Sequence, residues 1–283
     1  MTRDFLDLIS KHYDEMSKRQ RSVADYILEH GGSASHETAY TLADHAGVSE
    51  STVVRFAVFM GYEGYPEMQK ALRASLRKRM TTVERIEDVN ERVPEGDIID
   101  GVLDGDAEMI LSAKDELDRQ GFEKAVDMLL SAGKVYIVGM RSSAVLAQFM
   151  NHYLRLLLDN VTLVCPSGGS EVYEYLVNIT DSDMVFAISY PRYSSGTIRA
   201  AEFAHRRGAG VAVLTDSETS PVAAVADAVL VAKSEMVSLV DSLVAPMSII
   251  NAIIAYLSKK RPETAEKFRL LESVWDEFKV YTE

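Results

Sequence analysis

Apolar residues recur with the 3.6-residue period of a helix through residues 1–80 of the chain. Ser17 is a candidate N-cap for a helix in which Val23, Ile27 and Leu28 share a face, and His30-Gly31-Gly32 is expected to end it. Three more helices are expected to follow, beginning near Leu42, at Ser49 and after Pro66. This pattern predicts an all-α N-terminal domain.

From about residue 105 the pattern changes to short apolar runs separated by helical stretches. The runs are rich in Val, Ile and Leu and are flanked by turn residues: Val135–Met140, Val161–Cys165, Met184–Ser189, Val211–Thr215 and Ala228–Ala232. Amphipathic stretches such as Ala144–Leu158 and Ile198–Arg207 lie between them. Apolar strands that alternate with helices are typical of a parallel sheet covered on both faces. We therefore predict an α/β C-terminal domain with a doubly wound, flavodoxin-like sheet of five parallel strands.

Composition places the chain among ordinary globular proteins. Hydrophobic residues make up 47% and charged residues 26% of the 283 positions, which provides a sizeable core and argues against disorder. The apolar stretch 239–257 is interrupted by Asp241 and Pro246, so we expect a core helix rather than a membrane span. The single cysteine, Cys165, excludes an internal disulfide framework and suits a reducing compartment. No signal peptide is recognisable, and the chain is expected to be cytoplasmic.

The net charge of −13 is distributed unevenly. Residues 1–80 carry 11 basic and 11 acidic groups, residues 81–104 carry 2 and 8, and residues 105–283 carry 17 and 24. The middle segment is polar and acidic and contains Pro94 and Gly96, which favours a linker. We therefore expect a helical domain over residues 1–80, a linker over 81–104 and an α/β domain over 105–283. A uniformly basic coat for nucleic acid is excluded, whereas a local basic surface on the first domain is not.

The segment 41–56, TLADHAGVSESTVVRF, has the layout of two short helices joined by a tight turn. Ala43 is small enough for the two helices to approach closely, and Gly47 permits the turn four residues later. Val48 and Val53 are expected to anchor the turn and the second helix in the core. This layout is that of a helix-turn-helix, whose second helix lies in the major groove of DNA.

On this interpretation eight side chains are candidate DNA contacts. Arg55 is placed to pair with guanine, Ser49 and the helix N-terminus to hold a phosphate, and the cations of the next helix to add phosphate contacts. The set is Ser49, Glu50, Ser51, Thr52, Arg55, Lys70, Arg73 and Arg77. Of these, Glu50, Ser51, Thr52 and Arg55 are expected on or near the exposed side of the second helix. The alternative is a plain helical bundle whose charges are merely solvated.

A second candidate site lies at the carboxyl ends of the first and third predicted strands, where a doubly wound sheet binds its ligands. The loops 139–144 (GMRSSA) and 189–197 (SYPRYSSGT) each contain an arginine and several hydroxyls and lead into a helix. Hydroxyls, free amides and a positive helix end suit a phosphate monoester or a carboxylate. The alternative for each serine is a helix cap.

Other ligand classes are disfavoured. Neither G-x-G-x-x-G nor G-x-x-x-x-G-K-[ST] occurs, which argues against a dinucleotide site and a P-loop. The six histidines show no metal-ligand spacing. We therefore expect no metal and no cofactor.

Together the two halves resemble the RpiR family of bacterial transcription regulators, which join an N-terminal helix-turn-helix domain to a sugar isomerase (SIS) domain. The resemblance covers nearly the whole chain and is most specific over VADYILEH and TLADHAGVSESTVVRFAVFMGYEGYPEMQKAL. The SIS part resembles the family over KVYIVGMRSSAVLAQ and FAISYPRYSSGTIRAAEFAHRRGAGVAVLTD. The resemblance implies double-stranded DNA and a phosphorylated sugar effector as partners. It also implies a homodimer or a tetramer, for which a palindromic operator is expected.

SIS loops usually resemble G-x-G-x-S after the first strand and S-x-S-G-x-T after the third. Carried over by position, each loop replaces a glycine by an arginine, Arg141 in the first and Arg192 in the second. Pro191 and Ser194 stand where the family has serine and threonine. The effector-binding candidates are Gly139, Arg141, Ser142, Ser143, Ser189, Arg192 and Ser194.

The two arginines allow two interpretations. They add positive charge for a more anionic effector, such as a sugar-acid phosphate, or they fill the pocket or form ion pairs at a subunit interface. The sequence leaves both open.

Catalysis is not expected. Glu171, Glu174, His152 and His205 are the candidate bases for an isomerisation, but none lies in a recognisable motif. His152 falls in an apolar helix and is expected to be a core or interface residue. The lead hypothesis is therefore a sugar-phosphate-responsive, DNA-binding transcription regulator. The alternatives are a SIS-fold sugar-phosphate isomerase with a helical appendage, and a ligand-sensing adaptor that binds protein.

Overall fold

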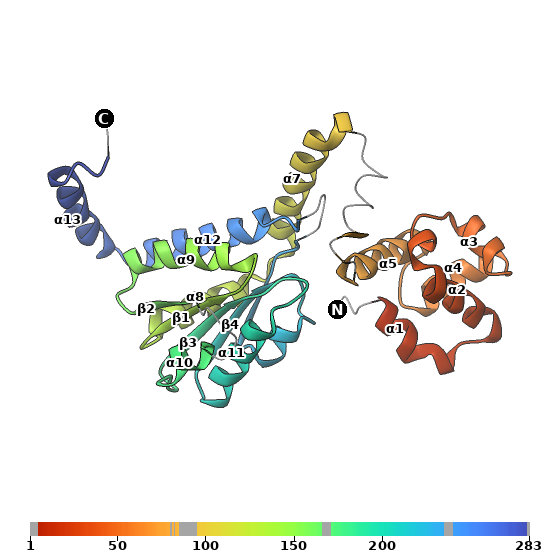
Figure 1. The fold of residues 1–283 in the computed structure, drawn as a ribbon, viewed down its shortest axis with the longest axis horizontal. Coiled ribbons are helices and arrows are strands. Elements are labelled where there is room, and N and C mark those ends of the chain that lie inside the picture. The colour runs from red at the N-terminus through yellow and green to blue at the C-terminus, as the bar shows by residue number, and fades with distance from the viewer. Residues whose placement is uncertain are drawn as a thin grey trace. The chain divides into compact units, whose positions relative to one another are not determined.

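The structure, a computed structural model, describes residues 5–79, 81, 83–84, 95–165, 171–234 and 240–281. The chain divides into two compact units, Met1–Val93 and Pro94–Glu283. Each unit has its own hydrophobic core. Figure 1 shows the helices of the first unit and the sheet and helices of the second.

The first unit is all-α, as predicted. Its elements are α1 (Phe5–His12), a short 3-10 turn (Tyr13–Glu15), α2 (Lys18–Ala34), α3 (Ala39–His45), α4 (Glu50–Phe59) and α5 (Tyr65–Arg79). Each helix contributes to one core, which includes the buried side chains of Phe5, Ile27, Leu42, Phe56 and Leu72. The pattern of apolar positions did not predict α1, which covers this core with Phe5 and Ile9.

Ser17 caps α2 as predicted. Its hydroxyl accepts from the Gln20 amide at 3.4 Å, and the Gln20 side chain accepts from the Ser17 amide at 2.9 Å. The predicted end at the two glycines is wrong, because α2 kinks at His30 and continues to Ala34. A Cβ on Gly31 would lie 2.9 Å from a Leu76 methyl carbon, so glycine there allows α5 to pack closely.

The second unit is α/β. Its elements before the third strand are a 3-10 turn (Glu95–Asp97), α7 (Ile98–Glu116), α8 (Arg119–Ser131), β1 (Val135–Gly139), α9 (Ser143–Leu157), β2 (Val161–Val164) and α10 (Val172–Leu176). They are followed by β3 (Met184–Ile188), α11 (Ser195–Arg206), β4 (Gly210–Thr215), a 3-10 turn (Pro221–Val225), β5 (Ala228–Val231), α12 (Val244–Lys260) and α13 (Thr264–Glu277). Residues 98–104, which composition placed in the linker, are therefore helical. The acidic residues there lie on an exposed helix surface, which composition alone does not separate from a linker.

The five strands form one parallel sheet in the order β2-β1-β3-β4-β5, which confirms the predicted doubly wound fold. Helices α7, α8, α9 and α12 pack on one face, and α10 and α11 on the other (Figure 1). The apolar stretch that begins near 239 supplies α12, a core helix as expected. No helix among the described residues is long and apolar enough to cross a bilayer.

Candidate functional site

The helix-turn-helix layout is present in the first unit. Gly47 adopts φ = +65°, which a residue with a Cβ adopts only under strain, and this lets α3 turn into α4. Ala43 is buried where the two helices meet, and Val53 is fully buried under α4. The turn is closed by the Val48 amide, which donates to the Ala43 carbonyl at 2.9 Å.

The solvent face of α4 holds most of the predicted contact residues. Glu50, Ser51 and Arg55 are exposed, and the Arg55 guanidinium donates to the carbonyl and hydroxyl of Ser51 at 3.1 and 3.3 Å. The expectation that Thr52 lies on or near the exposed side is wrong. Thr52 is only 4% exposed, and its hydroxyl lies 2.9 Å from that of Ser49. Position 52 faces inward beside Val53, so it cannot reach a base from this helix face.

Sequence reasoning missed two apolar residues on this face. Val54 and Val58 are 40% and 56% exposed and stand one helical turn apart. Their spacing is visible in the sequence, but an apolar residue in a helix does not by itself show whether it faces the core or the solvent. An apolar side chain next to Arg55 suits contact with a thymine methyl group.

The predicted basic face of α5 is divided between two roles. Lys70 is exposed. Arg73 is half-buried, and its Nε donates to the Ser35 carbonyl at 2.7 Å, so it holds the end of α2 in place. The side chain of Arg77 lies outside the described residues.

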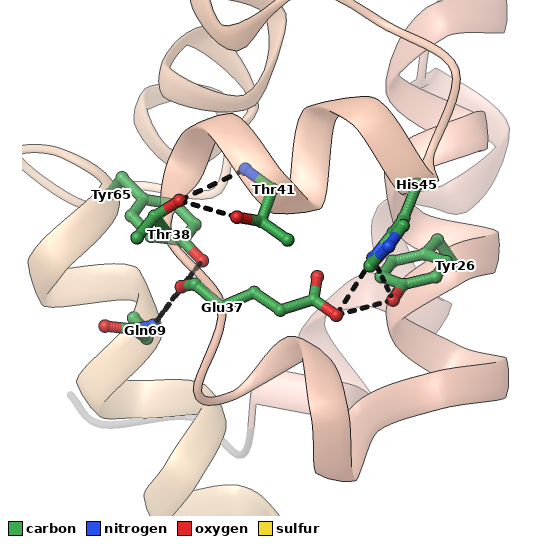
Figure 2. Close-up of polar contacts among 7 residues, drawn as sticks. All are labelled: Tyr26, Glu37, Thr38, Thr41, His45, Tyr65 and Gln69. Atoms are coloured by element: carbon green, nitrogen blue, oxygen red, sulfur yellow. Dashed lines mark hydrogen bonds and ion pairs between the residues drawn. The ribbon is translucent and has the colours of Figure 1, made fainter.

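A polar cluster around Glu37 fixes α3 against its neighbours (Figure 2). One carboxylate oxygen of Glu37, Oε1, accepts from the Tyr26 hydroxyl of α2 at 2.7 Å and lies 3.0 Å from His45 Nδ1 at the end of α3. The Glu37 carbonyl accepts from the Tyr65 hydroxyl and the Gln69 amide of α5 at 2.7 and 2.6 Å. One residue therefore ties α2, α3 and α5 together.

Burial makes this cluster sensitive to the loss of a partner. The Glu37 side chain is 12% exposed, and its second oxygen, Oε2, is buried without a hydrogen-bond partner among the described residues. Desolvation, followed by the hydrogen bond to Glu37, raises the pKa of Tyr26 to about 12. The hydroxyl therefore stays protonated and keeps donating at neutral pH.

We expect Glu37→Gln to destabilise the first unit by about 1–3 kcal/mol. If the amide oxygen keeps the bond to Tyr26, the NH₂ group takes the buried place of Oε2, where the described residues offer no acceptor. Urea unfolding followed by circular dichroism measures the change. Glu29→Gln, at a side chain that is 76% exposed on α2, is the matched control and should be neutral. Equal stability of Glu37→Gln and wild type would contradict this role.

The second candidate site begins where β1 turns into α9. Gly139 is paired in register with Ile188 of β3, so the two loops leave adjacent strand ends. A Cβ on Gly139 would lie 2.6 Å from the Ser143 carbonyl oxygen, which explains glycine there. The loops also touch farther out, since the Ser194 hydroxyl donates to the sulfur of Met140 at 3.5 Å.

Both arginines that replace family glycines have left-handed backbones. Arg141 has φ = +58° and Arg192 has φ = +61°. This conformation costs a residue with a Cβ roughly 1–2 kcal/mol. Both side chains are exposed at the carboxyl edge of the sheet. The loop shape that favours glycine is thus kept, while the side chains change.

The predicted serines divide into buried and exposed positions. Ser143 opens α9 and is 4% exposed, and Ser189 directly follows β3 and is 2% exposed. Ser142 is exposed and Ser194 is half-buried just before α11. Neither Ser142 nor Ser194 forms a side-chain cap on its helix.

Buried hydroxyls without a partner gather around the second loop. Ser189 Oγ, the Tyr190 hydroxyl and Thr197 Oγ1 have none within the part of the chain that the structure describes. Burial raises the pKa of Tyr190 well above its usual value, with a smaller contribution from Asp216. Thr197 and Tyr190 were missed by sequence reasoning, because the ungapped match to the family loop ended at Ser194. Unpaired buried hydroxyls require an explanation, and a ligand supplies one.

The candidate bases for catalysis do not converge. His152 and His205 are exposed on α9 and α11, and Glu174 is exposed on α10. Glu171 lies just before α10. His152 was expected to be a core or interface residue. It is exposed on α9 with its ring against Tyr153, so it is not a core residue, and the interface role stays a prediction. No group of three potential metal ligands occurs among the described residues.

Two family models match the chain. The helix-turn-helix domain of the rpiR family matches residues 3–79, and the SIS domain matches residues 128–256. A curated relative, the HTH-type transcriptional regulator HexR of Escherichia coli, is 29% identical over 221 residues, which cover 76% of this chain and 73% of HexR.

Solved structures extend the likeness. The sugar isomerase domain of an RpiR transcription factor from Sphaerobacter thermophilus is 31% identical, with a TM-score of 0.58, over 61% of this chain and 96% of that one. The Vibrio vulnificus NanR protein, solved with ManNAc-6P, is 22% identical, with a TM-score of 0.61, over 97% of this chain and 98% of that one. The second match shows the fold across both units.

Proposed function

The chain belongs to the RpiR family of transcription regulators, and we propose that it binds operator DNA through α4 and a phosphorylated sugar or sugar acid through its SIS domain. The observation that carries the proposal is the pair of sites in one chain. A helix-turn-helix with an exposed polar face precedes a sheet whose carboxyl edge holds buried hydroxyls without partners. A sugar-phosphate isomerase needs no helix-turn-helix, and the candidate bases do not converge, so we propose sensing rather than catalysis.

The DNA contact we propose centres on Arg55. Its guanidinium lies on the exposed face of α4, supported by Ser51, and a bidentate pair with guanine matches its geometry. Ser49 and Lys70 are also exposed and are proposed to contact backbone phosphates, whereas the exposed carboxylate of Glu50 is repelled by phosphates and is proposed only as a base contact. We propose no direct DNA contact for Thr52, which is buried, or for Arg73, whose guanidinium bonds the Ser35 carbonyl.

We expect Arg55→Ala to weaken specific DNA binding by about 1–3 kcal/mol and to relax base preference at one position. Lys70→Ala should weaken binding to all sequences evenly and lower the salt slope by about one. Fluorescence anisotropy across a salt series, on DNA upstream of the gene and its neighbours, measures both. Arg199→Ala, exposed on α11, is the control. Wild-type protein without specific DNA binding would overturn this half of the proposal.

The effector site we propose uses the buried hydroxyls of Ser143, Ser189 and Thr197 with the N-termini of α9 and α11. An anion at these helix ends is stabilised by free amides and by the helix dipole. Hydroxyl donors then complete the shell of a phosphate monoester. Ser142 and Ser194 lie at the rim of the same site.

We expect Thr197→Val to act oppositely on stability and on binding. Without ligand the variant should be more stable by about 1 kcal/mol, because a buried hydroxyl without a partner is removed. Its affinity for the phosphate ester should fall about tenfold, because a donor is lost. Thermal unfolding with and without a panel of sugar phosphates measures both, and Thr264→Val on α13 is the remote control. A phosphate ester that stabilises both proteins equally would contradict the site.

We propose that two copies of the chain associate. Large apolar side chains are exposed on α7 and on α13 with its C-cap residue, among them Ile99 at 72%, Leu103 at 61%, Leu270 at 68% and Phe278 at 69%. Apolar surface of this extent on two helices is typical of an interface. A closed dimer would place two recognition helices on a palindromic operator. Sedimentation velocity at micromolar concentration should give at least twice the chain mass of 31.4 kDa, and a monomer would contradict it.

A further inference from the structure

The exposed face of α4 is polar at its N-terminal end and apolar towards its C-terminal end. The Arg55 guanidinium folds back towards the polar end, where it donates to the carbonyl and hydroxyl of Ser51 at 3.1 and 3.3 Å. The remaining half of the face consists of Val54 at 40% exposure, Val58 at 56% and Phe59 at 38%. After Arg55 the helix contains no polar side chain.

Val54 and Val58 form one ridge beside Arg55, because residues four apart lie on the same side of a helix. At a rise of about 1.5 Å per residue they are about 6 Å apart along the helix axis. Successive bases of a DNA strand are about 3.4 Å apart, so the ridge spans less than two base-pair steps. A recognition helix that brings Arg55 to a base edge therefore brings both valines to the neighbouring base pairs.

The core of the first unit does not account for these two valines. Val53 and Ala57, which are fully buried, supply the packing on the inner face of α4. A β-branched side chain loses rotamer freedom in a helix, so valine is a poorer choice than alanine at an exposed position. Phe59 differs from the valines, because its ring packs edge-on against His12 of α1 with the centroids 6.4 Å apart. The two valines are therefore apolar surface that continues the proposed DNA contact around Arg55.

The major groove offers one large apolar group to such a surface. Base edges there present hydrogen-bond donors and acceptors, and thymine adds its C5-methyl group. A valine set against a donor or acceptor would remove water from that polar group without replacing the hydrogen bond, which is unfavourable. A valine set against a methyl group removes apolar surface of both from water, which is favourable.

We infer that Val54 and Val58 read thymine methyl groups, so that each operator half-site carries thymine within two base pairs of the guanine bound by Arg55. This inference rests on the proposed function and adds the base that the apolar half of α4 selects. Arg55 recognises guanine by hydrogen bonds, whereas the valines favour thymine over cytosine by burial of its methyl group.

Deoxyuridine tests this contact directly, because it pairs with adenine as thymine does and lacks only the methyl group. The full chain is titrated by fluorescence anisotropy with the DNA fragment that it protects upstream of the gene, and with the same fragment carrying deoxyuridine at every thymine. Wild-type protein should bind the thymine duplex about fourfold more tightly for each methyl group contacted. Single replacements should place the sensitive thymines within two base pairs of the guanine at which Arg55→Ala relaxes base preference.

A double variant, Val54→Ser with Val58→Ser, removes the apolar ridge. Serine and valine have similar helix propensities, so α4 should be retained. The variant should bind both duplexes equally, with the affinity of wild type for the deoxyuridine duplex, and this retained binding shows that the protein is folded. Val145→Ser is the matched control, since Val145 is 57% exposed on α9 of the second unit. It should keep the wild-type preference for thymine.

The outcomes separate this inference from the function on which it rests. Specific binding with equal affinity for the two duplexes would overturn the inference and leave the proposed function standing. A thymine preference that persists in the double variant would also overturn it, because DNA shape would then be the cause. So would a lower sedimentation mass of the double variant, which would assign the valines to contact between copies of the chain. Absence of specific binding to any upstream fragment would remove the proposed function and the inference with it.

Discussion

The close approach of β1 and α9 at Gly139 is the constraint on which the ligand end of the sheet depends. No side chain fits between that strand end and the Ser143 carbonyl, so the chain reverses within three residues and passes through left-handed backbone at Arg141. The turn after β3 also passes through left-handed backbone, at Arg192. These two turns set the helix N-termini and the buried hydroxyls at one edge. The side chains at the left-handed positions can then vary without changing the scaffold, and this chain has placed positive charge there.

In the first unit, apolar packing and polar bonds hold different helices. The inner face of α4 is anchored by apolar packing of Val53 and Phe56, while α3 is held by polar bonds that converge on Glu37. Apolar packing tolerates small sliding. The Glu37 carboxylate, which bonds α2 and α3, and the Glu37 carbonyl, which accepts from α5, set the angles of these helices more sharply. Arg73 adds a bond from α5 to the end of α2. The position of the exposed residues of α4 therefore depends on contacts made by other helices and not on the sequence of α4 alone.

The sequence predicted the fold well and the sites only in part. Five apolar runs with intervening helices are enough to predict the parallel sheet, because strands buried on both faces leave no polar alternation. Thr52 was misplaced because a helical period locates a face to within one position, and neighbouring elements then decide which residues are covered. Thr197 was missed because the family motif was matched without a gap. The bonds of Glu37 join residues up to 32 positions apart, a separation at which no local pattern gives a signal.

Thermodynamics limits how strongly an effector can change DNA affinity, whatever structural path connects the two sites. An effector shifts DNA affinity only by the ratio of its own affinities for the two DNA-binding states. A shift from 1:99 to 99:1 requires a ratio of about 10⁴. For the proposed effector site this ratio has to arise in the loops that surround the sheet edge, because the edge itself is fixed by the close approach of Gly139 to the Ser143 carbonyl.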